Sequence, residues 1–215
     1  MSPPKPQRVL VVGAGPFQVD LIAGARAMGA EVVAVDRLPD APGMALADHA
    51  FPINIVDVDA VVALADRLQV DAALTAASDA AVPAVSAVVE ARGLCGIPPS
   101  VVAVCRDKLR TFEAVRAAGL PVPETRFVGG PAEVEAAVQA VGGFPLVVKP
   151  ASAAGGRGVA VVPARAGLSA AIERARQYAG AGGGVLLQAY VDGRSVGVEA
   201  FLWRGQVVAA FVLDD

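Results

Sequence analysis

The chain contains, from residue 144 to residue 158, the stretch Phe144-Pro-Leu-Val-Val-Lys-Pro-Ala-Ser-Ala-Ala-Gly-Gly-Arg-Gly158. Its apolar first part is typical of a buried strand, and that strand ends on Lys149. Ligands of α/β folds bind in the crevice beyond the carboxyl ends of the strands, which is where a lysine in this position directs its ammonium group. We therefore take Lys149 as a candidate binding residue.

The loop that follows, Ser152 to Gly158, is longer than the two residues that a tight hairpin needs. Its small residues leave backbone amides that can close over phosphate oxygens, and Arg157 adds a fork-shaped donor. The loop lacks the G-K-[ST] ending of a Walker A motif. Glycine and proline are abundant in this chain (23 and 16 residues), so a glycine-rich connection without a ligand is the alternative. Coupled to Lys149, the loop predicts phosphate binding by Ser152, Gly155, Gly156, Arg157 and Gly158.

Lysine is scarce: of 18 basic residues, only Lys5, Lys108 and Lys149 are lysines. Lys5 lies in a proline-rich N-terminal segment, whereas Lys108 opens a predicted helix over 106–118. A chain that uses arginine for its ordinary surface has little reason to keep a lysine there. Lys108 is therefore a second candidate, with a solvated helix residue as the alternative.

On both sides of residue 144 the pattern predicts further regular elements. We expect a helix over 131–141 before it and a helix over 168–179 after it. Three strand-like runs follow, over 185–190, 196–203 and 206–213. A final strand with no closing element leaves an uncovered edge, which suggests that the domain is incomplete.

The first hundred residues alternate between apolar runs and helical patterns. We expect strands over 8–12, 31–35 and 71–74, and helices near 21–28, 60–68 and 79–91. Such alternation predicts a parallel sheet covered on both faces, that is, a Rossmann-like α/β domain. The break at Gly93 to Pro99 places the domain boundary near 100–105, so we assign the domains to residues 1–104 and 105–215.

The turn Gly13-Ala-Gly-Pro-Phe-Gln18 begins like the dinucleotide fingerprint G-x-G-x-x-G, and Asp36 lies where a ribose-binding acid would. Gln18 stands in place of the third glycine. The turn therefore leaves two interpretations, an NAD(P)-dependent oxidoreductase or a tight turn in a Rossmann-like domain that binds no dinucleotide. The missing glycine favours the second.

Composition excludes several classes of function. A net charge of −3 argues against a broad surface for nucleic acid or anionic membrane, and no apolar run approaches the roughly 20 residues that span a bilayer. The N-terminus lacks the features of a signal peptide, so we expect a cytoplasmic protein. Cys95 and Cys105 predict small core residues rather than a disulfide or metal site, and His49 is assigned to a loop. Ser78-Asp79 is assigned to a helix cap.

Taken in order, seven segments resemble the ATP-grasp superfamily over nearly the whole chain, in particular its carbamoyl-phosphate-synthase-like and amino-acid-ligase-like members. No single segment decides this; their order and spacing do. They are Gly13-Ala-Gly-Pro-Phe-Gln18, Asp36-Arg-Leu-Pro-Asp-Ala-Pro-Gly43, Thr75-Ala-Ala-Ser-Asp79, Arg106-Asp-Lys-Leu109, Gly119-Leu-Pro-Val-Pro123, Phe144-Pro-Leu-Val-Val-Lys-Pro150 and Leu186-Leu-Gln-Ala-Tyr-Val-Asp-Gly193. The resemblance implies a Rossmann-like pre-ATP-grasp domain followed by an incomplete α+β ATP-grasp domain.

The resemblance also implies roles for residues. Lysines that match Lys108 and Lys149 contact nucleotide phosphates, and the loop that matches Ser152 to Gly158 folds over the β- and γ-phosphates. The segment that matches Gln188, Ala189, Tyr190 and Val191 is the hinge whose backbone reads the adenine edge. The family often has glutamate where this chain has Gln188, and a ribose-binding glutamate near Ser195. Glu199 is the acid that could take over the ribose contact.

The activity implied is ATP-dependent ligation of a small carboxylate to an amine through an acyl phosphate. The partners are then ATP and the two substrates, with a homodimer as a further expectation. The family's Mg²⁺ ligands lie on strands beyond residue 215, so this chain resembles a fragment that binds nucleotide weakly and is inactive alone. A non-catalytic nucleotide-binding module remains a third alternative.

Overall fold

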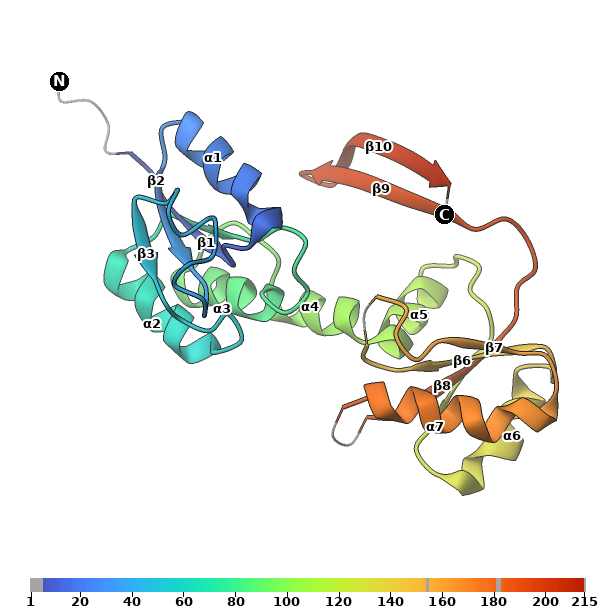
Figure 1. The fold of residues 1–215 in the computed structure, drawn as a ribbon. Helices are drawn as coiled ribbons and strands as arrows, with labels where there is room; N and C mark the ends of the chain where they lie inside the picture. Colours follow the sequence, from blue (N-terminus) through green and yellow to red (C-terminus); the bar gives the residue numbers. More distant parts are fainter. Residues whose placement is uncertain (1–5, 154, 181–182, 215) are drawn as a thin grey trace. The chain divides into compact units, whose positions relative to one another are not determined.

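The computed structural model describes residues 6–153, 155–180 and 183–214. It divides into two compact units, Met1–Leu120 and Pro121–Asp215 (Figure 1).

The first unit is built on a parallel sheet of four strands in the order β3-β2-β1-β4. The central strands β1 (Arg8–Val12) and β2 (Glu31–Val35) are rich in β-branched residues and are almost wholly buried, as strands covered on both faces must be. The flanking strands β3 (His49–Phe51) and β4 (Ala72–Leu74) are short.

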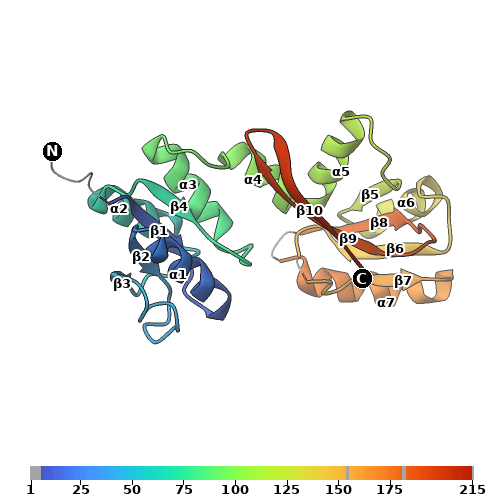
Figure 2. The same cartoon turned by 90° about the horizontal axis from the view of Figure 1, so that it is seen from above.

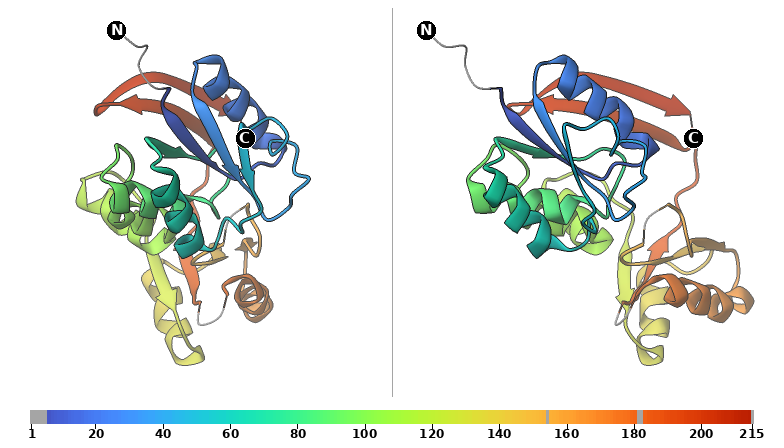
Figure 3. Two further views of the ribbon diagram at one scale, coloured as in Figure 1. Left: turned by 90° about the vertical axis from the view of Figure 1, so that its left-hand side faces the viewer. Right: turned by 60° about the vertical axis from the view of Figure 1, so that its left-hand side comes forward.

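Helices cover both faces of this sheet, shown on opposite sides in Figure 3, with α1 in blue and α2 and α3 in teal and green. Helix α1 (Val19–Ala27) follows the 3-10 turn η1 (Pro16–Gln18) and buries Ile22 against Val11 and Val32. Helices α2 (Val58–Leu68) and α3 (Val82–Arg92) bury their apolar sides against the alternate residues of the same strands. Two further helices, α4 (Pro99–Arg106) and α5 (Lys108–Ala117), complete the unit.

The second unit contains an antiparallel sheet in the order β5-β8-β6-β7. Its strands are β5 (Thr125–Val128), β6 (Leu146–Pro150), β7 (Ala160–Val162) and β8 (Val185–Ala189). Helices α6 (Val134–Ala140) and α7 (Leu168–Tyr178), preceded by the turns η2 (Pro131–Glu133) and η3 (Arg165–Gly167), bury their apolar sides against one face of this sheet, and Figure 2 shows α7 running along it. The opposite face is the one relevant to the candidate site.

The last two strands, β9 (Val196–Trp203) and β10 (Gln206–Asp214), form an antiparallel hairpin. Among the described residues they pair only with each other. Their apolar side chains are exposed on both faces, with Phe201 at 63% on one face and Val212 at 72% on the other. The hairpin has no core of its own.

The expected architecture, a parallel α/β part followed by antiparallel sheets, is confirmed. The sequence missed three elements: β3, β5 and α4. Helix α4 begins at Pro99, and proline suits the first turn of a helix because its missing N–H has no intrahelical partner there. From the sequence pattern alone, the same prolines predict only a break.

Three smaller assignments were wrong. His49 is the first residue of β3 and not part of a loop, and its Nε2 lies 2.9 Å from Oε1 of Glu31. Cys95 and Cys105 are exposed rather than buried in the core. Ser78 and Asp79 do not cap α3, because that helix begins after Ala81 without a side-chain cap.

The domain boundary predicted between residues 104 and 105 stays a prediction. In the structure, helices α4 and α5 on either side of it both belong to the first compact unit, which extends to Leu120. Over the described ranges, no helix has the length and apolar character needed to cross a membrane.

Candidate functional site

Lys149 lies on the face of the second sheet that α6 and α7 do not cover. Side chains alternate along β6, so Leu146 and Val148 enter the core beneath the helices and Lys149 points to the other side. Its Nζ donates a hydrogen bond of 2.8 Å to Oε1 of Gln188 on the neighbouring strand β8. The structure thus brings together two of the predicted site residues that are 39 positions apart.

Gln188 also contacts Thr125, a residue that the sequence did not single out. The Gln188 Nε2 donates to the Thr125 hydroxyl at 2.7 Å, and the two residues are partners across β8 and β5. Both side chains are buried, at 7% and 4% exposed. No local signal could have found Thr125, because the contact depends on strand pairing across 63 positions.

The glycine-rich loop connects β6 to β7 and is fixed at both ends. The hydroxyl of Ser152 donates to the Ala179 carbonyl at 3.1 Å, which ties the start of the loop to the end of α7. At the other end, Gly158 lies against α7 and Pro150 with φ at +75°. Between these anchors Gly155, Gly156 and Arg157 are exposed.

Gly155 and Gly156 have φ of +69° and +68°, and nothing lies within 4 Å of a β-carbon added to either. Glycine adopts such left-handed conformations without the steric cost of a side chain. These exposed glycines leave open space beside the backbone. Phosphate binding by the loop stays a prediction. Ser152 and Gly158, in contrast, have packing roles that explain their presence without a ligand.

The predicted adenine hinge begins inside the sheet and ends outside it. The N–H of Ala189 donates to the Glu124 carbonyl at 2.8 Å and so belongs to the pairing of β8 with β5. Tyr190 and Val191 follow the last strand residue and are 42% and 68% exposed. Of the four hinge residues, these two are the better candidates for backbone contacts with a base.

Lys108 belongs to the first unit, at the start of α5. Asp107 caps this helix by accepting bonds from the N–H groups of Leu109 and Arg110. Burial lowers the pKa of Lys108 below the ordinary lysine value, and the carboxylates of Asp79 and Asp107 oppose that effect. Asp79 lies in the segment after β4, which ends at Leu74.

Lys108 and Lys149 lie in different compact units. That they contact one nucleotide therefore stays a prediction from the resemblance. The same holds for the ribose contact at Ser195 or Glu199, the latter of which lies exposed on β9.

The dinucleotide interpretation of the first turn meets a steric obstacle. The Gln18 side chain is buried and donates to the Ala76 carbonyl, and it lies 3.4 Å from a β-carbon built on Gly13 and 3.2 Å from one built on Gly15. Asp36 accepts bonds from the N–H groups of Ala14 and Leu38, at 2.9 and 3.0 Å. Gln18 thus fills the space beside the two glycines, and each oxygen of Asp36 accepts a backbone hydrogen bond.

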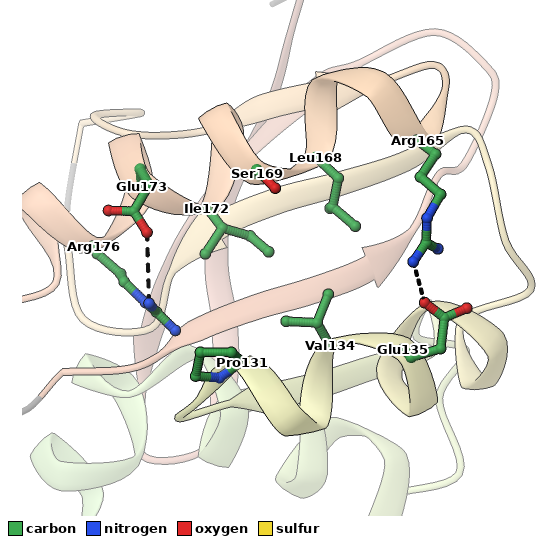
Figure 4. Close-up of a pocket in the computed structure, with 9 residues that line it drawn as sticks. All are labelled: Pro131, Val134, Glu135, Arg165, Leu168, Ser169, Ile172, Glu173 and Arg176. Carbon is green, nitrogen blue, oxygen red and sulfur yellow. Dashed lines mark hydrogen bonds and ion pairs between the residues drawn. The ribbon is translucent and has the colours of Figure 1, made fainter.

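A separate hollow of about 380 Å³ lies between α6 and α7 (Figure 4). Its floor is apolar, with Leu168 and Ile172, and its charged groups pair with one another as Arg165 with Glu135 and Arg176 with Glu173. It lies on the helix side of the sheet, away from Lys149.

Within residues 6–153, 155–180 and 183–214, no group of three histidine, cysteine, aspartate or glutamate side chains could hold a metal ion.

A family model described as an ATP-grasp domain matches residues 105–213, which is half of the chain. The chain belongs to the ATP-grasp family. The matched residues include both candidate lysines, the glycine-rich loop and the hinge.

Among known ATP-grasp relatives, a formate-dependent phosphoribosylglycinamide formyltransferase from Burkholderia pseudomallei is 37% identical over 186 residues, which is 85% of this chain and 44% of the relative. The chain thus spans less than half the length of such relatives.

Two solved structures share the fold. An L-amino acid ligase from Bacillus licheniformis has a TM-score of 0.76 at 21% identity, over 95% of this chain and 49% of the ligase. The biotin carboxylase domain of 2-oxoglutarate carboxylase from Hydrogenobacter thermophilus, a dimer in complex with MgADP, ADP and bicarbonate, has a TM-score of 0.73 at 21% identity, over 89% of this chain and 46% of that one.

Proposed function

We propose that this chain is the nucleotide-binding part of an ATP-dependent ligase that joins a small carboxylate to an amine. The observation that carries the proposal is the Lys149–Gln188 contact on the sheet face opposite α6 and α7, at the start of a loop with two exposed glycines. Membership of the ATP-grasp family supports ATP as the nucleotide that binds here. The MgADP bound by the biotin carboxylase domain supports binding of the nucleotide as its magnesium complex.

In the proposed reaction a carboxylate oxygen attacks the γ-phosphorus of ATP, and the bond between that phosphorus and the β–γ bridging oxygen breaks. ADP leaves, and an acyl phosphate remains. The amine nitrogen then attacks the acyl carbon, loses a proton and expels phosphate. Carboxylates are poor acyl donors, so the phosphoryl group supplies the leaving group.

The residues of this chain would stabilise the negative charge of the phosphates and cover the bound nucleotide. The Lys149 ammonium would stabilise negative charge on the phosphates, with Lys108 in the same role if the two units share the nucleotide. The loop amides at Gly155 and Gly156, with Arg157, would cover the phosphates, and the backbone of Tyr190 and Val191 would hold the base. Mg²⁺ supplies charge neutralisation between phosphates in such reactions. Among the described residues, no group of three histidine, cysteine, aspartate or glutamate side chains could hold it.

The formyltransferase relative makes formate and phosphoribosylglycinamide the first substrates to test. A homodimer and a cytoplasmic location belong to the same proposal, the first by analogy with the dimeric biotin carboxylase domain.

The decisive experiment is calorimetric titration of the chain with MgADP and MgATP, comparing the parent with Lys149→Ala. Loss of a charge-assisted hydrogen bond of roughly 1.5–3 kcal/mol predicts about 10- to 100-fold weaker binding. Lys5→Ala, which removes the same charge outside the predicted motifs, is the matched control. Equal affinities for parent and Lys149→Ala would remove Lys149 from the site.

The activity itself is tested by ADP release from a version of the protein that includes any sequence encoded beyond Asp215. Formate, amino acids and other carboxylates are screened for stimulation, with and without the amine. Nucleotide binding without stimulated release under every condition would favour the non-catalytic module. Titration with NADH, which the Gln18 geometry argues against, checks the oxidoreductase alternative.

A further inference from the structure

Three hydrogen bonds form a continuous chain from the backbone of the second unit to Lys149. The Thr125 hydroxyl donates to the Pro123 carbonyl at 3.0 Å, Gln188 Nε2 donates to the Thr125 oxygen at 2.7 Å, and Lys149 Nζ donates to Gln188 Oε1 at 2.8 Å. The two central side chains are buried, so their polar groups depend on these partners.

The direction of this chain follows from what each group can do. A carbonyl only accepts, so the Thr125 hydrogen points to Pro123 and a lone pair of the hydroxyl oxygen faces Gln188. That lone pair selects the NH₂ end of the Gln188 amide. The amide oxygen is thereby turned to Lys149, whose ammonium group only donates.

We propose that Thr125 and Gln188 are positioning residues that hold the Lys149 ammonium at one point of the sheet face opposite α6 and α7 through a neutral acceptor. The proposal rests on the proposed function insofar as that ammonium meets nucleotide phosphates. A glutamate in place of Gln188 would accept from the lysine equally well but would add a negative charge beside it, whereas the amide adds none. Thr125 matters because, without it, the amide could turn and present N–H groups to the lysine.

The simpler alternative is that Thr125 and Gln188 only stabilise the pairing of β5 with β8. That role would change the free energy of unfolding but not the ionisation of Lys149. The pKa of Lys149 is therefore the readout that separates the two.

The scarcity of lysine makes this measurement direct. Selective ¹³C labelling of lysine gives signals from only Lys5, Lys108 and Lys149. The signal that disappears in Lys149→Arg is the signal of Lys149. In Thr125→Val, which replaces the hydroxyl by a methyl of similar shape, we expect the Lys149 pKa to fall, because an oriented acceptor favours the charged form. Thr125→Ser keeps the hydroxyl and should restore the parent value.

Gln188→Glu provides the second variant, independent of whether Thr125→Val folds well. The new carboxylate should raise the Lys149 pKa, while the affinity for ADP should fall about tenfold because the net charge at the site drops by one. In Thr125→Val we expect ADP to bind about three- to tenfold more weakly.

An unchanged Lys149 pKa in folded Thr125→Val would overturn the proposal, and so would an unchanged Lys149 pKa in Gln188→Glu. If no protein in the series binds nucleotide, the proposed function fails while the pKa measurement still decides whether the positioning occurs. If nucleotide binds and Lys149→Ala weakens it, but Thr125→Val matches the parent in pKa and affinity, only the positioning role is refuted.

Discussion

Gly158 lies against the ring of Tyr178, and a β-carbon built on the glycine would come within 2.8 Å of Tyr178 Cδ2. The same atom would lie 3.3 Å from the Ala175 α-carbon and 3.4 Å from Pro150 Cδ. The end of the glycine-rich loop is therefore packed on α7, whereas Gly155 in the same loop has open space around it. Two glycines that look alike in sequence have different physical roles.

This difference predicts different costs for the same substitution. Gly158→Ala should lower the free energy of unfolding by about 1–2 kcal/mol for the left-handed backbone and by about 1–3 kcal/mol more for overpacking. Gly155→Ala, at a position with a similar φ and no close neighbour, should lower the free energy of unfolding only by the cost of the left-handed backbone, about 1–2 kcal/mol. Urea unfolding of the two variants measures the difference, and equal midpoints would show that Gly158 is not packed as described.

Gln18→Ala should destabilise the first unit. The substitution removes the donor to the Ala76 carbonyl, and an unsatisfied acceptor in a part-buried site costs about 1–3 kcal/mol. It also opens space beside Gly13 and Gly15. Gln7→Ala, at an exposed position of the same unit, is the control and should change stability little. A loss no larger than that of Gln7→Ala would contradict the buried role of Gln18.

Asp79→Asn should lower the pKa of Lys108 further. Burial already lowers it, and Asp79 is the larger of the two carboxylate effects that oppose burial. Removing that negative charge leaves desolvation less opposed. The lysine-selective ¹³C signals described above follow this titration, with the exposed Asp59→Asn as control. A Lys108 pKa that does not change, or that rises, would show that the Asp79 carboxylate does not raise the pKa of Lys108.

The stability of the first unit should fall in acid partly because of Glu31. Hydrogen bonds from Arg8, at 2.8 and 2.9 Å, and from His49 hold the pKa of Glu31 below its ordinary value of 4.5. A carboxyl whose folded-state pKa is lowered stabilises the fold above its unfolded-state pKa, and the contribution is lost as pH falls below about 4.5 toward the folded-state value.

Glu31→Gln should therefore be less stable than the parent at pH 7 and lose less stability between pH 5 and pH 3. Chemical unfolding at both pH values measures this, with the exposed Glu90→Gln of α3 as control. A parallel loss in parent and Glu31→Gln would show that Glu31 does not contribute to the acid sensitivity.

Much of the architecture could be predicted from local pattern. The run before Lys149 and the runs at β1 and β2 are apolar and bounded by glycine or proline, so their strands follow from the sequence alone. Elements with weaker patterns were missed. β3 has only three residues, and the exposed side chains in β5 hide its alternation.

The candidate site was predictable only in part. Lys149 and Gln188 could be named separately, but their contact depends on the antiparallel pairing of β6 with β8, which no local signal specifies. Thr125 was missed for the same reason. The opposite roles of Gly155 and Gly158 depend on where α7 lies, which the spacing of glycines does not reveal.

The hairpin of β9 and β10 carries the chain's single tryptophan, Trp203, which is 57% exposed. Indole fluorescence shifts to shorter wavelength when the ring leaves water. The protein therefore contains an intrinsic optical reporter at the hairpin, so that emission spectra alone can follow whether a further segment, a second molecule or a substrate-induced rearrangement shields these strands.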